Sequence, residues 1–284
     1  RILFLLTIAF LNLGSGLCKT RQSLRIMSYN IRIGIGMDQQ TNLKRIAEVI
    51  NKIQPDYVGL QEVDSVCERS GWINQYAELA RLTGMYPIFA PATERSKGLY
   101  GIAALSRKKP RSYQYIPLPG KEEPRTFLCL EYPNYTLCNT HFSLDPDSRL
   151  ASIRLINETM KSENKPILIT GDFNMEPDSK EFKAMKQTWR LLSDPTLETY
   201  PSDHPRLRLD YIFGDLKHEF RIINDQVIDI QSSDPLPIYI DVLFYAFSPA
   251  ILRIPNNTNL EILNVVRDFH AIRMLPIGFK QNIS

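Results

Sequence analysis

The sequence predicts an α/β fold in which two β-sheets pack face to face with helices on their outer sides. Strand-like apolar runs fill most of the middle of the chain, and only a few segments show helical periodicity. The segment from residue 24 to residue 61 is typical of a strand, a helix and a second strand in one sheet. At 284 residues the chain can form one large domain or two small ones.

The first predicted strand, Leu24–Arg32, leads into a loop that contains glycines. Thr41 could cap the following helix, whose apolar residues recur at helical spacing: Leu43, Ile46, Ala47, Val49, Ile50 and Ile53. Pro55 ends this helix, and a strand over Tyr57–Gln61 follows. The next predicted helix spans Trp72–Leu82 and ends before a glycine.

The rest of the domain is predicted to be mostly strands. Successive strands with short turns cover Tyr86–Ala90, Tyr100–Ser106, Tyr113–Leu118, Arg125–Tyr132 and Tyr135–Phe142. The pattern then predicts helix Asp147–Met160, a strand from Pro166, helix Ser179–Lys186, and strands Leu207–Phe213, Phe220–Asp229 and Pro237–Phe244. Residues 248–284 are rich in Asn and Pro, and we expect a C-terminal tail of unknown role there.

The N-terminal residues are typical of a secretory signal peptide that lacks its initiator Met. Arg1 precedes a short apolar run, Ile2–Leu11, and small residues follow it. A lipoprotein attached through Cys18 and an N-terminal membrane anchor remain as alternatives. We therefore expect residues 1–18 to be a signal peptide, residues 22–247 to be the folded domain, and the protein to be exported to the periplasm, the outer surface or the medium.

Export bears on the cysteines, because disulfides persist in oxidising compartments. If Pro133-Asn134 is a two-residue hairpin loop, Cys129 faces Cys138 at a non-hydrogen-bonded position of the two strands. A cross-strand disulfide and two free buried thiols are both compatible with this register.

Charge and composition exclude some classes of protein. The hydrophobic fraction of 43% and charged fraction of 23% are those of a globular protein, which excludes a disordered chain. The net charge is only +3, and no block of five Lys or Arg residues occurs. Charge alone therefore gives no case for a nucleic-acid surface, although it is compatible with a phosphate-containing substrate.

Polar side chains follow several predicted strands at the point where each strand ends. The apolar run Ile167–Ile169 leads through Gly171 to Asp172 and Asn174. Other predicted strands end at or carry Asn30, Glu62, His141 and Asp210. Side chains presented together at a sheet rim are held by rigid elements, which is where a phosphate or metal site is expected.

Six motifs occur in order along the chain: Met27–Ile31, Leu60–Asp64, Tyr100–Ser106, Asn139–His141, Gly171–Asn174 and Arg208–Phe213. In kind, order and spacing they resemble the endonuclease/exonuclease/phosphatase superfamily, which comprises metal-dependent phosphoesterases built like pancreatic deoxyribonuclease. The resemblance covers residues 24–244. It implies a four-layer α/β/β/α sandwich of two mixed sheets and the hydrolysis of a phosphate ester with Mg²⁺ or Mn²⁺.

The resemblance also implies roles for individual residues. Glu62 corresponds to the direct metal ligand, with Asn30 beside it, and Asp234 supports the metal site. His141 corresponds to the histidine that contacts the scissile phosphoryl group. Asp172 corresponds to the residue that orients or deprotonates the attacking water, and Asn174 to the donor that holds a phosphate oxygen.

One position departs from the family pattern. The family carries Ser-Asp-His-x-Pro near its end, whereas this chain has Ser-Asp-Pro-Leu-Pro over residues 233–237, so Pro235 replaces the catalytic histidine. Asp210, which orients that imidazole in the family, is expected to lack its partner. General acid–base help of about 10²–10⁴-fold would be lost. His204, in a second Ser-Asp-His stretch within a loop, could partly substitute.

Two functions follow from these observations. The first is an exported phosphoesterase, slowed by Pro235; the second is an inactive relative that binds a phosphate ligand or nucleic acid. The substrate is a phosphoester, either nucleic acid or a small or lipid phosphoester, and the sequence favours a small or single-stranded one. Arg69 and Arg125 are candidate phosphate contacts, with a role in ion pairs as the alternative. We expect a monomer that requires no protein partner.

Overall fold

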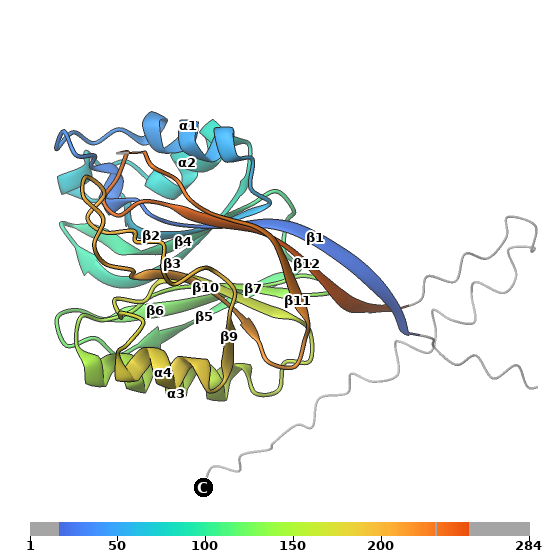
Figure 1. Ribbon diagram of the computed structural model, residues 1–284. Helices are drawn as coiled ribbons and strands as arrows, with labels where there is room; N and C mark the ends of the chain where they lie inside the picture. The colour runs from blue at the N-terminus through green and yellow to red at the C-terminus, as the bar shows by residue number, and fades with distance from the viewer. Residues whose placement is uncertain (1–16, 231, 250–284) are drawn as a thin grey trace, which may run out of the picture. The chain divides into compact units, whose positions relative to one another are not determined.

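Two six-stranded β-sheets lie face to face and carry helices on their outer faces (Figure 1). The computed structural model describes residues 17–230 and 232–249, of which Leu17–Ser248 form one compact unit. The strand order is β11-β12-β1-β2-β4-β3 in the first sheet and β5-β6-β7-β8-β10-β9 in the second. The predicted four-layer sandwich of two mixed sheets is confirmed.

The elements of each half are as follows. The first sheet contains β1 (Leu17–Asn30), β2 (Tyr57–Ser65), β3 (Tyr86–Arg95), β4 (Gly98–Ser106), β11 (Phe220–Val227) and β12 (Ile238–Pro249), with α1 (Leu43–Ile53) and α2 (Gln75–Thr83) on its outer face. The second contains β5 (Ser112–Leu118), β6 (Arg125–Glu131), β7 (Thr136–His141), β8 (Ile167–Asp172), β9 (Trp189–Leu191) and β10 (Asp210–Asp215), with α3 (Pro146–Met160) and α4 (Lys180–Lys186) outside. Short 3₁₀ turns occur at η1 (Arg32–Gly34) and η2 (Glu68–Ser70).

Three apolar clusters match the three interfaces between the four layers. Between the sheets, side chains such as Ile26 of β1 and Leu168 of β8 pack in one buried cluster. A second cluster joins α1 and α2 to the first sheet, and a third joins α3 and α4 to the second sheet. Each sheet is therefore apolar on both faces, which removes most of its strand surface from water and explains its continuous apolar runs.

Helix α1 begins one residue later than the predicted cap. The side chain of Asn42, and not that of Thr41, accepts a hydrogen bond from the backbone N–H of Arg45. Six residues with helical spacing, Leu43 to Ile53, are buried against the sheet as predicted. The helix ends at Gln54, whose φ of 56° is left-handed, directly before Pro55.

Several strand boundaries differ from those predicted. Strand β3 continues to Arg95, because Ser96 and Lys97, with φ of 48° and 62°, form a tight turn into β4. Strand β9, only three residues long, was not predicted. Strand β10 begins at Asp210, so this residue lies at the strand's first position and not inside it.

Strand β1 begins at Leu17, inside the range predicted as a signal peptide and ahead of the domain start predicted at residue 22. Residues 1–16 and 250–284 lie outside the described residues, so the signal peptide and most of the tail remain predictions. Within residues 17–230 and 232–249, no helix is long and apolar enough to cross a membrane.

The predicted hairpin register around the cysteines is confirmed. The backbone N–H of Tyr132 donates to the carbonyl of Tyr135 at 2.9 Å, and Cys129 pairs with Cys138 across the two strands. The two Sγ atoms lie 3.0 Å apart as free thiols, and both side chains are buried beneath α3. Of the two alternatives, the structure has the buried thiols.

One amide from the second sheet joins it to the first. The Nδ2 of Asn139 in β7 donates to the carbonyls of Leu60 and Ala103, each at 2.9 Å, and its Oδ1 accepts from Gln61 Nε2 at 2.7 Å. Close approach here requires Gly59, because a Cβ at that position would lie 2.6 Å from Asn139 Oδ1. This cluster of residues 59–61, 103 and 139, the inter-sheet clamp, fixes the spacing of the two sheets beside the site.

Candidate active site

The first sheet contributes Asn30 and Glu62 from neighbouring parallel strands. Asn30 ends β1 and pairs with Gln61 in β2. The pairing of β2 with β4 shifts between Leu60 and Val63, which marks a bulge at Gln61 and Glu62. Glu62 has a left-handed φ of 56° at this bulge. A bulge re-aims a side chain out of the regular alternation of a strand, so Glu62 faces the pocket and not the outer helices.

The second sheet contributes His141, Asp172 and Asp210 from three adjacent strands. The register pairs His141 with Asp172 in the parallel ladder of β7 and β8, and Asp172 with Asp210 in the antiparallel ladder of β8 and β10. Asp172 therefore lies between an imidazole and a second carboxyl group. This placement follows directly from where each strand ends or begins.

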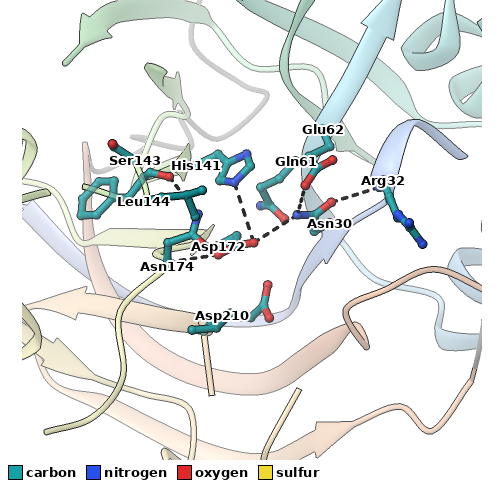
Figure 2. A network of polar contacts seen from close by, with 12 residues as sticks. Asn30, Arg32, Gln61, Glu62, His141, Ser143, Leu144, Asp172, Asn174 and Asp210 are labelled. Atoms are coloured by element: carbon teal, nitrogen blue, oxygen red, sulfur yellow. Dashed lines mark hydrogen bonds and ion pairs between the residues drawn. The ribbon is translucent and has the colours of Figure 1, made fainter. Parts of the chain in front are cut away.

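Hydrogen bonds join the two halves of the site (Figure 2). Asn30 Nδ2 donates to Glu62 Oε1 at 2.9 Å and to Asp172 Oδ2 at 3.1 Å, so one amide bridges two carboxylates from different sheets. Asn30 Oδ1 in turn accepts from the backbone N–H of Arg32 at 3.0 Å. His141 Nε2 lies 3.8 Å from Asp172 Oδ2 on the other side.

One pocket collects most of the predicted site residues. Its volume is about 410 Å³, and seven of the nine predicted residues line it: Asn30, Glu62, Arg125, His141, Asp172, Asn174 and Asp234. Asp210 is buried behind the pocket, next to Asp172. Arg69 does not line it: its guanidinium makes a two-point ion pair with buried Asp64, at 2.9 and 2.7 Å. The structure therefore places Arg69 in an ion pair outside this pocket.

Burial raises the pKa values of Glu62, Asp172 and Asp210, three carboxyl groups at the site. Burial is the main cause for Glu62 and Asp172, and the Asp172 charge raises the pKa of Glu62 further. The pKa of Asp210 lies well above its usual range because of burial and the neighbouring Asp172. Burial, followed by the positive charge of Arg125, holds the pKa of His141 well below its ordinary value.

This charge distribution fits a hard divalent cation. Two carboxylates, Glu62 and Asp172, share one amide donor, and no ion pair neutralises Glu62 within the described residues. Mg²⁺ and Mn²⁺ prefer oxygen ligands, and Mg²⁺ keeps several waters, so one or two protein oxygens suffice. Within the described residues, no group of three His, Cys, Asp or Glu side chains is arranged to hold a metal ion.

Asn174 and Arg125 are already engaged with the protein. Asn174 has a left-handed φ of 47°, and its Nδ2 donates to the carbonyl of Phe142 at 2.9 Å. One N–H of that amide remains for a ligand. Arg125 contacts Glu122 and Glu123 at 2.7 and 3.1 Å, and its Nη1 lies 3.2 Å from His141 Nδ1. The alternative of an ion pair therefore holds for Arg125, although it lines the pocket.

The position of the missing histidine is filled by an apolar wall. Pro235 is buried and lines the pocket together with Leu209 and Tyr200. In place of the imidazole that the resemblance implies, the hydroxyl of Thr199 donates a hydrogen bond to Asp210 Oδ2 at 2.7 Å. Asp234 lines the pocket, and its Oδ1 accepts from the backbone N–H of Ser202 at 2.7 Å.

His204 does not reach the site. Its side chain is exposed, contacts the backbone carbonyl of Asp203, and is absent from the pocket wall. Sequence reasoning missed Tyr100, Leu144 and Tyr200, which line the pocket. Tyr100 belongs to a motif noted in the sequence, but Leu144 and Tyr200 lie in loops whose positions have no sequence signal.

Comparison with known proteins agrees with this fold. Residues 27–234 match the family model of the Endonuclease/Exonuclease/phosphatase family, whereas no curated protein sequence matches the chain. A solved endonuclease/exonuclease/phosphatase from Beutenbergia cavernae DSM 12333 is similar, with a TM-score of 0.67, 21% identity, and coverage of 78% of this chain and 72% of that one. The chain belongs to this family of hydrolases that act on phosphoesters.

Two further structures share the fold. Mannosyl-6-phosphatase of Bacteroides thetaiotaomicron VPI-5482 has a TM-score of 0.61 and 18% identity, and the match covers 77% of this chain and 99% of that one. The human Nocturnin catalytic domain, solved with a bound sulfate anion, has a TM-score of 0.61 and 20% identity, with coverage of 80% and 97%. At these identities the similarity concerns the fold.

Proposed function

We propose that this protein is an exported hydrolase of phosphate esters that works with bound Mg²⁺ or Mn²⁺. The observation that carries the proposal is the convergence of Asn30 and Glu62 from one sheet with His141 and Asp172 from the other on a single pocket. Export rests on the predicted signal peptide at residues 1–18.

The residues of the pocket divide the work of phosphoryl transfer. Glu62, with Asn30 and Asp234 nearby, would hold the cation, which when bound supplies charge neutralisation at the phosphoryl group. The Asp172 carboxylate orients a water and accepts its proton. His141 and the free amide N–H of Asn174 donate hydrogen bonds to phosphoryl oxygens, which stabilises the charge of the transition state.

The proline at position 235 supports the proposal that turnover is slow. A proline side chain neither donates nor accepts a proton, so the leaving group receives no help from this position. The same observation favours a second candidate function, a module that binds a phosphate ligand or nucleic acid without turnover. The pocket is small, at about 410 Å³, which supports a small or single-stranded phosphoester as substrate. We also propose that the protein acts as a monomer.

The first test compares hydrolysis of bis-p-nitrophenyl phosphate and plasmid DNA by the parent and by Asp172→Asn, with Mg²⁺ or Mn²⁺ and with EDTA. We expect EDTA to abolish turnover and Asp172→Asn to lower kcat by about 10²–10⁴-fold. Asp38→Asn is the matched control, because Asp38 is an exposed aspartate paired with Arg45 on the surface. Turnover that survives EDTA or Asp172→Asn contradicts the proposed mechanism. Metal binding without turnover supports the binding module.

A further inference from the structure

Arg125 lies beside the pocket; its two terminal nitrogens contact protein partners, whereas its buried Nε has no hydrogen-bond partner among the described residues. Its side chain is 6% exposed. Nη2 donates to Glu122 Oε1 at 2.7 Å, and Nη1 lies 3.1 Å from Glu123 Oε1 and 3.2 Å from His141 Nδ1. The guanidinium therefore faces two carboxylates and the ring nitrogen that points away from Asp172.

This contact determines where the proton of His141 can be. A guanidinium is always protonated and only donates hydrogen bonds, so the nitrogen that faces it has to accept. His141 Nδ1 is then unprotonated, and the single proton of the neutral ring is on Nε2. We propose that Arg125 is a positioning residue that fixes His141 in the Nε2–H tautomer and thereby gives the pocket one hydrogen-bond donor.

The other groups around His141 are consistent with this assignment. Burial and the Arg125 charge lower the pKa of His141 well below its ordinary value, and Glu122 opposes them with a smaller effect, which favours the neutral ring. From β8, Asp172 Oδ2 lies 3.8 Å from Nε2. This distance exceeds the length of a hydrogen bond, so the Nε2–H remains available to an oxygen of a bound ligand.

Two glutamates hold the guanidinium in place. Besides Arg125, Glu122 accepts from Ser143 Oγ at 2.6 Å and from the backbone N–H of Leu144 at 2.9 Å. Glu123 also pairs with Arg95. Arg125 is thereby tied to the loop after β7, which carries Leu144 into the pocket. A lysine has the charge but not the planar fork that serves Glu122, Glu123 and His141 together.

The tautomer has a chemical consequence that rests on the proposed function. With Nδ1 occupied by Arg125 and a proton on Nε2, His141 has no free lone pair facing the pocket. It donates a hydrogen bond to a phosphoryl oxygen and does not deprotonate the attacking water. Proton acceptance in the pocket is left to the Asp172 carboxylate, which agrees with the role proposed for it.

The tautomer can be measured without any turnover. The 284-residue chain, labelled with ¹⁵N-histidine, gives ring nitrogen signals whose two-bond couplings to the ring protons show which nitrogen carries hydrogen. His141→Asn identifies the signals of His141 among the four histidines. We expect a protonated Nε2 and an unprotonated Nδ1 in the parent at neutral pH. A protonated Nδ1 overturns the proposal.

Substitutions then test whether Arg125 is the cause. We expect Arg125→Met to give a mixture of tautomers and to lower kcat about tenfold or more, with a smaller change in KM, because the lost donor serves the transition state. Arg125→Lys should restore part of both, since it keeps a charged donor. Arg81→Met, on an exposed arginine of α2 paired with Glu78, is the control and should change neither.

The outcomes are separable. If Arg125→Met keeps the tautomer of the parent, Arg125 does not set it and the proposal fails. If the parent shows the Nε2–H tautomer but hydrolyses no phosphoester, the proposed function fails while the positioning role of Arg125 stands. If Arg125→Met does not fold, the tautomer of His141 measured in the parent and in Arg125→Lys still tests the proposal.

Discussion

Burial makes a negative charge on Glu62, Asp172 or Asp210 unfavourable in the folded protein. Asp210 is the clearest case, because it is buried and faces Asp172, and both effects raise its pKa. A carboxyl group whose pKa is raised on folding stabilises the folded state below its unfolded pKa, near 4. That contribution is lost as the pH rises through the folded pKa.

Asp210→Asn should therefore stabilise the metal-free protein at pH 8, by roughly 1 kcal/mol or more, and lose this advantage at pH 4. The asparagine can still accept the Thr199 hydrogen bond, so the change isolates the charge. Urea unfolding in EDTA across this pH range measures the difference, with Asp38→Asn on the surface as control. A variant less stable than the parent at pH 8 would show that other groups in the folded protein stabilise the charge of Asp210.

Pro235→His should restore proton transfer if the added imidazole reaches the pocket wall. Pro235 lines the pocket, and buried Asp210 is paired with Asp172, which also lines it. We expect kcat for bis-p-nitrophenyl phosphate to rise about 10²-fold or more, and activity to fall on either side of an optimum pH. His204→Ala should leave the parent's activity unchanged, because His204 is exposed outside the pocket. An unchanged kcat in Pro235→His would mean that another step limits turnover.

At the scale of elements, the hairpin of β6 and β7 places two thiols together and shields them. The pKa of Cys138 lies well above its usual range because of burial, so the reactive thiolate is scarce at neutral pH. We expect Cys129 and Cys138 to be free, to resist iodoacetamide in the folded protein at pH 7, and to react after unfolding. Peptide mass mapping checks this result. A peptide pair lighter by two hydrogens would show a disulfide instead.

The bulge in β2 determines the direction of the Glu62 side chain, which the sequence alone does not predict. The sequence indicates that Glu62 follows a strand, but the shift of register that turns it into the pocket depends on pairing with β4. The hydrogen bond from Thr199 to Asp210 and the contact of Arg125 with His141 likewise join residues with no shared local pattern. Such contacts follow from the packing of distant segments and were not predicted.

At the scale of the whole molecule, the order of elements and the rim of polar residues could be predicted because both follow from local periodicity. Asn30, Glu62, His141 and Asp172 were predicted to meet because each ends a strand or follows directly from one. Strand β9 was missed because three residues give no readable period. Its place is fixed instead by pairing with β10.

The inter-sheet clamp makes the stability of the molecule depend on one buried amide. Asn139→Leu would leave the carbonyls of Leu60 and Ala103 without this donor in a dry interface. We expect a loss of about 2–4 kcal/mol in the free energy of unfolding, measured in urea. Asn51→Leu is the matched control, because Asn51 also donates to a backbone carbonyl, that of Leu82, but at the surface. A loss no larger than in the control would mean that the sheets hold their spacing without the clamp.

Strands β1 and β12 are antiparallel neighbours in one sheet. Thr20, near the start of β1, contacts Ala246 near the end of β12, and Arg25 contacts the earlier residue Asp241. The start of β1 and the end of β12 therefore leave the domain side by side, while Asn30 lies at the other end of the 14-residue strand β1. At about 3.3 Å per residue this separation is about 40 Å. A fluorophore or surface tether attached where β1 starts and β12 ends would leave the pocket clear. The domain is also suited to circular permutation, in which a short linker joins these two strand ends and new termini are placed in another loop.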